Sequence, residues 1–108
     1  MTYRKKPLGS SRLTKTYSLT IVKEARRLLK LQLGNVIGFY LSEDKQTILL
    51  KSAQIESGME GLKLLGSSTL TTSYAVTFPK QARELLKVEK GGRLVFYELP
   101  NNSVSVES

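Results

Sequence analysis

The chain has 108 residues, of which 40% are hydrophobic and none is cysteine or histidine, and its 17 Lys and Arg outnumber its 9 Asp and Glu to give a net charge of +8. This composition predicts a folded chain of one ordinary domain or two very small ones, and the lack of cysteine excludes a disulfide framework and a thiolate metal site. No apolar run approaches the ~20 residues that span a bilayer, so we expect a cytoplasmic protein with no membrane segment, whose positive charge favours an anionic partner such as nucleic acid.

The elements predicted along the chain come twice in the same order. A β-type alternation broken by a polar turn is followed by a short helix with one apolar face and then by two strands. In the first half these elements cover residues 12–21, 23–31, 36–41 and 47–51. In the second half they cover residues 70–78, 80–88, 94–99 and 103–107.

Local signals mark the ends of the two helices. Gly34 and Gly91 follow them, at points where a residue without a Cβ suits a turn. Pro79 is expected at the first position of the second helix, where its missing N–H does no harm. Thr77 is expected to supply a cap for that helix.

The chain also repeats its own sequence with an offset of 57 residues. Leu8-Gly9-Ser10-Ser11 returns as Leu65-Gly66-Ser67-Ser68, and 17 of the 33 positions in 8–40 are identical to their counterparts in 65–97. This match predicts a duplicated structural unit, and because about fifty residues are barely enough for a core, we expect the two units to share one. The predicted organisation is a basic N-terminal arm, a first repeat, a linker and a second repeat, covering residues 1–7, 8–52, 53–64 and 65–108.

The two halves differ in charge. Residues 1–54 hold eleven Lys and Arg against three Asp and Glu, whereas residues 55–108 hold six of each kind. The net charge of the whole chain therefore lies in the first half. Two units with one pattern and different charges are expected to have divided their roles, with the contacts to an anionic partner made mainly by the first repeat.

The segment Val76-Thr77-Phe78-Pro79-Lys80-Gln81-Ala82-Arg83, with Leu85 and Gly91 after it, resembles the signature of the AbrB/SpoVT family. Residues 19–27 resemble the signature a second time, with Val22 where the proline usually stands. The resemblance implies a mainly β fold with short helices, a swapped-hairpin β-barrel, built here from two ββαββ-type repeats as a pseudo-twofold barrel. It leaves open whether the barrel closes within one chain, as an intrachain pseudo-dimer, or by exchange in a homodimer.

The resemblance also implies binding of double-stranded DNA, sequence-nonspecific or at an operator, by a small prokaryotic transcriptional regulator associated with the nucleoid. Family members contact DNA through the first hairpin and the helix start. The cations at matching positions are Arg12, Lys15, Lys23, Arg26, Arg27, Lys80 and Arg83. The basic arm adds Arg4, Lys5 and Lys6, which suit contacts to phosphates or a groove.

Several of these residues have a structural alternative. Arg26 and Arg83 occur in both repeats, so their side chains are also suited to packing on the barrel with the charged head in water or paired. The repeated aromatic residues are expected to pack in the core or at its rim and not to stack on bases. They are Tyr17, Phe39, Tyr40, Tyr74, Phe96 and Tyr97.

Nothing in the sequence predicts an enzyme. The usual general bases and nucleophiles, His and Cys, are missing, the acids are scattered, and no glycine-rich phosphate loop is present, so we expect no catalytic site, cofactor or metal. Two alternatives to a regulator stay open. One is an antitoxin of the same fold family, for which we would expect a toxin-binding tail after the last predicted strand, residues 103–107. The other is a protein-interaction scaffold that does not use nucleic acid.

Overall fold

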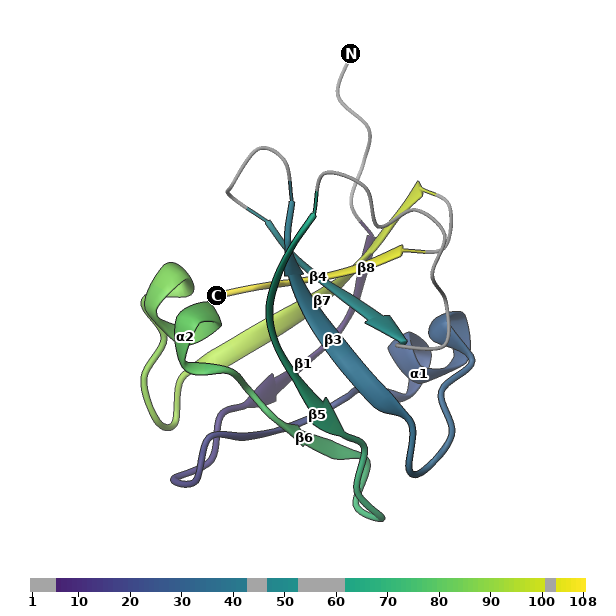
Figure 1. Ribbon diagram of the computed structural model, residues 1–108, viewed down its shortest axis with the longest axis horizontal. Helices are drawn as coiled ribbons and strands as arrows, with labels where there is room; N and C mark the ends of the chain where they lie inside the picture. The colour runs from purple at the N-terminus through teal and green to yellow at the C-terminus, as the bar shows by residue number, and fades with distance from the viewer. Residues whose placement is uncertain (1–5, 43–46, 53–61, 101–102) are drawn as a thin grey trace.

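The computed structural model describes residues 6–42, 47–52, 62–100 and 103–108, so Arg4, Lys5 and most of the predicted linker 53–64 lie outside the described residues. The described residues form a mainly β protein with two short helices (Figure 1). The elements are β1 (Lys6–Arg12), β2 (Ser18–Thr20), α1 (Lys23–Leu29), β3 (Val36–Leu41), β4 (Ile48–Ser52), β5 (Lys63–Thr69), β6 (Ala75–Thr77), α2 (Lys80–Leu86), β7 (Arg93–Leu99) and β8 (Ser103–Glu107).

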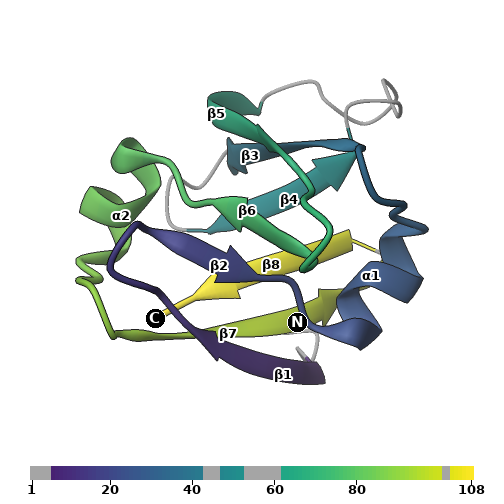
Figure 2. The same ribbon diagram turned by 90° about the horizontal axis from the view of Figure 1, so that it is seen from below.

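The strands form two antiparallel sheets. One has six strands in the order β1-β7-β8-β4-β3-β5, and the other is a ribbon of β2 and β6 that lies below it in Figure 1 and in front of it in Figure 2. Four of the six strand pairings join the two halves of the chain: β1 with β7, β2 with β6, β3 with β5, and β4 with β8. The halves are therefore interleaved within a single chain, and the helices lie at opposite ends of the molecule (Figure 2).

The predicted barrel is not confirmed. The six-stranded sheet ends in the edge strands β1 and β5, and within the described residues its hydrogen bonds do not close into a ring. The sheet and the β2–β6 ribbon instead enclose the interior as two layers (Figure 1).

The first strand of each half was predicted to begin too late. β1 starts at Lys6 and β5 at Lys63, so Lys6 belongs to a strand, opposite Glu98, and not to an arm. The Gly-Ser-Ser segments of these strands have low β propensity, which hid them from the sequence pattern. Pairing with β7 and β3 of the other half supplies the backbone partners that make them strands.

Both helices end two residues earlier than predicted. Lys30 and Lys87 adopt the left-handed conformation, each with φ of 54°, and the chain turns away there. The capping of α2 was also predicted wrongly. Pro79 is the residue before the helix, with an extended ψ of 149°, and no side chain caps either helix. Thr77 still belongs to β6, where its N–H donates to Ser68 Oγ at 2.9 Å.

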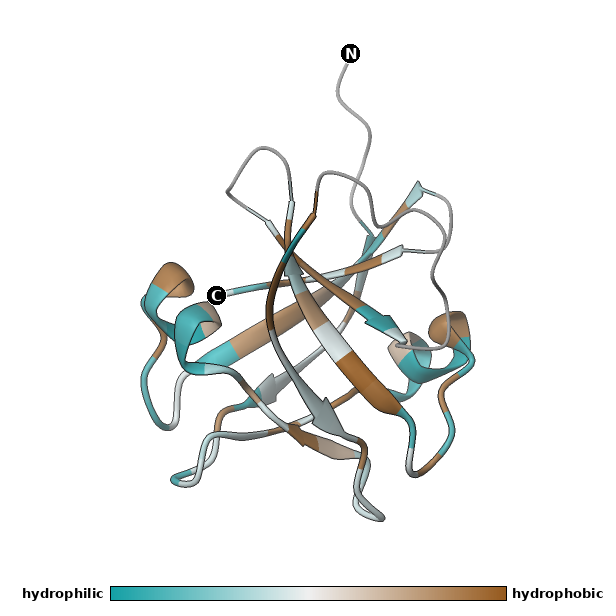
Figure 3. Ribbon diagram, in the orientation of Figure 1, coloured by the Kyte–Doolittle hydropathy of each residue, from teal (hydrophilic) through white to brown (hydrophobic). Residues whose placement is uncertain are grey.

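The core is shared between the halves, as predicted. One cluster of buried side chains includes Leu19, Phe39, Val76, Phe78 and Phe96, and the rings of Phe39 and Phe78 meet edge to face with centroids 5.3 Å apart. In Figure 3 the central strands carry much of the hydrophobic colour, while the helices carry both hydrophobic and hydrophilic colour. A fifty-residue half therefore does not need a core of its own.

The repeated Leu-Gly-Ser-Ser motif holds each first strand against the start of its own helix. A Cβ on Gly66 would lie 2.8 Å from the side chain of Pro79, and one on Gly9 would lie 3.2 Å from Val22. Ser11 Oγ donates to the carbonyl of Thr20 at 2.6 Å, which ties β1 to β2. The glycines are thus required by close approach, and the motif is structural.

Candidate nucleic-acid interface

The turn of each half packs against the connector that follows the helix of the other half. Leu13 donates its N–H to the carbonyl of Gly92 at 2.9 Å, and its carbonyl accepts from the N–H of Gly91. At the opposite end, Leu70 donates to Asn35 and accepts from Gly34 in the same arrangement. The predicted turn glycines have positive φ values of 89° for Gly34 and 81° for Gly91. Each end of the molecule is therefore built from both halves.

The two turns share one geometry. Thr14 Oγ1 accepts the N–H of Ser18 at 2.9 Å, and Thr71 Oγ1 accepts the N–H of Ala75 at 3.3 Å. Tyr17 and Tyr74 close the turns in the left-handed region, with φ of 62° and 59°. Because the backbones match, any difference between the two turns lies in their side chains.

One end carries a cluster of four exposed cations, which we name the basic tip: Arg12, Lys15, Lys90 and Arg93. Arg12 and Arg93 are direct partners in the β1–β7 pairing, and Arg93 donates to Ser10 Oγ at 2.8 Å. Like charges directly opposite on neighbouring strands destabilise a sheet, so this placement favours an anionic partner that offsets the repulsion.

The equivalent positions at the other end, 57 residues away in sequence, form what we name the neutral tip: Leu33, Val36, Thr69 and Thr72. Val36 is the direct partner of Thr69 in the β3–β5 pairing, just as Arg93 is of Arg12. Leu33 is 47% exposed and Val36 is 41% exposed. At these four equivalent positions, one tip thus carries four cations and the other carries none.

Arg26 and Arg83 each stack on the turn tyrosine of the other half. The guanidinium carbon of Arg26 lies 3.8 Å from the centre of the Tyr74 ring, and that of Arg83 lies 3.4 Å from the Tyr17 ring. Such cation–π contacts contribute about 0.5–2 kcal/mol depending on exposure. The stacks hold each turn to the opposite helix, which gives both arginines a structural role and explains why both repeats retain them.

A shallow cleft lies over each stack. At the end of the basic tip it is lined by Lys80, Lys87 and Lys90 together with Glu84 and Glu89. At the other end the equivalent cleft is lined by Lys23, Arg27, Lys30 and Gln32. Arg27 lies 3.6 Å from Glu24, but both side chains are more than half exposed, so this ion pair adds little stability. The cleft beside α1 is therefore more basic than the cleft beside α2, whereas the tip beside α2 is more basic than the tip beside α1.

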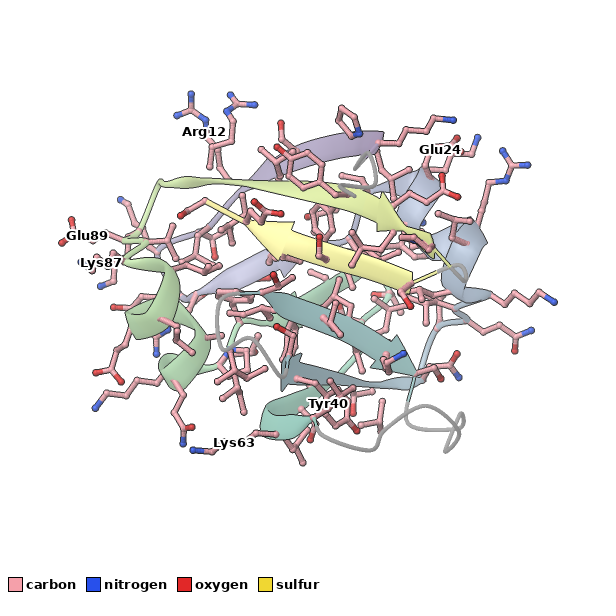
Figure 4. The ribbon with its side chains drawn as sticks, turned by 90° about the horizontal axis from the view of Figure 1, so that it is seen from above. Arg12, Glu24, Tyr40, Lys63, Lys87 and Glu89 are labelled. Atoms are coloured by element: carbon pink, nitrogen blue, oxygen red, sulfur yellow. The ribbon has the colours of Figure 1, made fainter. Side chains whose placement is uncertain are left out.

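The structure divides the predicted DNA-binding residues between the two ends. Arg12 and Lys15 lie at the basic tip, on the same end as Lys80 and Arg83. The cations of α1 lie at the other end, and Figure 4 shows Arg12 and Glu24 of α1 far apart. The first repeat thus presents no single basic face, because interleaving places its turn beside α2 and its helix beside the second turn.

Lys90 and Arg93 were not among the residues proposed from sequence. They come from the second half, whose six basic and six acidic residues cancel. The sequence repeat does contain this information, because Lys90 and Arg93 of the second half correspond to the apolar Leu33 and Val36 of the first. The two cations can be recognised as part of one cluster only from the pairing of β1 with β7, which places them beside Arg12.

Comparisons with protein-family models, with curated proteins and with solved structures found no match to this chain. Among the described residues, no helix is long and apolar enough to cross a membrane. Within the same ranges, no group of three or more His, Cys, Asp or Glu side chains is placed to hold a metal ion.

Proposed function

We propose that the protein binds double-stranded DNA as a small regulator of AbrB type, using the face formed by the β2–β6 ribbon and the two turns. The basic tip is the observation that carries this proposal. Its four cations come from both halves, all are exposed, and none forms an ion pair with any residue in the described ranges. Lys and Arg clustered in this way neutralise backbone phosphates and release their counterions.

The rest of this face supports the same partner. Neither residues 12–20 nor residues 69–77 include an Asp or Glu. Exposed hydroxyl groups cover the turns and the ribbon instead: Thr14, Thr16, Thr20, Thr71, Thr72, Ser73 and Thr77. Hydroxyl side chains are common donors to phosphate oxygens and position a protein on the duplex without reading its sequence.

The interleaved strands suggest how the fold relates to the family resemblance. We propose that they represent a swapped-hairpin arrangement completed within one chain, so that the protein is an intrachain pseudo-dimer. The four pairings between the halves support this reading. Light scattering is then expected to give the mass of a monomer, 12.1 kDa, in the absence of DNA. A dimer at micromolar concentration that dissociates only on unfolding would contradict it.

Fluorescence anisotropy with a labelled duplex tests DNA binding. Four phosphate contacts predict that affinity falls about a hundredfold between about 50 mM and about 200 mM salt. Absence of binding at about 50 mM salt, by a protein whose circular dichroism is that of a folded β structure, would falsify the proposed function.

A further inference from the structure

We propose that, on this ribbon face, DNA is bound at the end that carries the basic tip and not at the neutral tip, so that the DNA site lacks two-fold symmetry although the two tips share one backbone arrangement. This inference rests on the proposed DNA binding and specifies how that binding is oriented. It assigns Lys90 and Arg93, which come from the nearly neutral half, to the same contact as Arg12 and Lys15.

The backbone geometry of the two tips is alike, so it does not favour either tip for DNA contact. Equivalent hydrogen bonds join Leu13 to Gly91 and Gly92, and Leu70 to Gly34 and Asn35. The two stacks of arginine on tyrosine fix both turns against the helices at similar distances. Shape alone therefore does not distinguish the tips.

The side chains distinguish them at every one of the four equivalent positions. The equivalents of Arg12 and Lys15 in the other repeat are Thr69 and Thr72. The equivalents of Lys90 and Arg93 are Leu33 and Val36. A phosphate brought against Leu33 or Val36 would lose water without gaining a donor, which costs free energy. The same phosphate at the basic tip gains charge-assisted hydrogen bonds, which are about twice as strong as neutral ones.

The cations of α1 do not replace the tip cations that the neutral tip lacks. Lys23, Arg27 and Lys30 line the cleft on the helix side, with Glu24 beside Arg27. They attract DNA at long range, an effect that salt screens over about 10 Å. Ordered contact with the ribbon face requires cations on the tip itself, and these occur only at one end of the described structure.

The chain offers a matched pair of positions for a crosslinking test. Thr16 and Ser73 are equivalent, both are exposed, and each makes the same side-chain hydrogen bond, to Thr14 and Thr71 respectively. The protein contains no cysteine, so Thr16→Cys and Ser73→Cys each provide a single attachment point for a maleimide photocrosslinker. Each labelled protein is irradiated with the same duplex at low salt, after anisotropy has shown that it binds.

Crosslinking to DNA from position 16 is expected to exceed that from position 73 several-fold. Equal crosslinking from both positions, or from neither while anisotropy shows binding, would overturn the one-ended contact and leave DNA binding intact. Failure of the unmodified protein to bind any duplex at low salt would instead remove the proposed function itself.

Discussion

The basic tip and the neutral tip are two versions of one structure. Both combine the turn of one half with the connector of the other, and both place a tyrosine with positive φ under an arginine from the opposite helix. They differ in the four exposed side chains at equivalent positions. The comparison shows that one backbone arrangement carries two different sets of tip side chains, and we propose that these four positions set what each end binds.

The largest expected effect is the loss of DNA affinity when cations are removed from the basic tip. Lys15→Gln with Lys90→Gln lowers the net charge by two, as does the control pair Lys51→Gln with Lys63→Gln. Lys51 points away from the core beside the buried Leu50, and Lys63 lies at the end of β5 far from Thr69. We expect the slope of log K against log salt, measured by anisotropy, to fall by about 2 for the tip pair and to change little for the control. An equal fall in the slope for the tip pair and the control pair would mean that net charge alone governs DNA binding.

A second prediction concerns the residues that both halves share. Gly66→Ala places a Cβ 2.8 Å from the ring of Pro79 and is expected to destabilise the fold by about 1–3 kcal/mol, because overpacking forces neighbouring atoms apart. Urea unfolding measures the change. Gly34→Ala is the comparison, since nothing lies within 4 Å of its Cβ and only the positive φ is strained. A smaller loss for Gly66→Ala than for Gly34→Ala would contradict the proposed close approach.

The smallest expected effects come from the stacks. Tyr74→Leu removes one cation–π contact, with Arg26, and is expected to lower stability by about 0.5–1 kcal/mol. Tyr17→Leu removes two such contacts, with Arg83 and Lys90, and is expected to lower stability somewhat more. DNA affinity should respond unequally, since only Tyr17 supports the turn that carries Lys15. Equal losses of affinity from the two substitutions would argue that both tips contact DNA.

Much of the fold could be predicted from the sequence, and the failures have physical causes. Strands β3 and β8 were predicted to the residue, because β3 is a short apolar run bounded by turn residues and β8 alternates serine with valine, and both patterns indicate a strand. The starts of β1 and β5 were missed because their strand conformation depends on pairing with the other half. The helix ends were missed because lysines occupy the left-handed positions that glycine usually marks.

The candidate interface was less predictable than the fold. Arg12 and Lys15 were found from their charge and their place in the family pattern. Lys90 and Arg93 were not, because a sum of charges over each half conceals which cations meet in space. Arg26 was predicted chiefly as a DNA contact, and its stack on Tyr74 adds a structural role that only the exchange of partners between the halves produces.

The central claim is that the four tip residues decide which end contacts DNA, and exchanging them tests it most directly. The exchange combines Arg12→Thr, Lys15→Thr, Lys90→Leu and Arg93→Val with Leu33→Lys, Val36→Arg, Thr69→Arg and Thr72→Lys, and it keeps the net charge at +8. In a folded variant that still binds, we predict that photocrosslinking moves from position 16 to position 73. Crosslinking that stays at position 16 would contradict the claim.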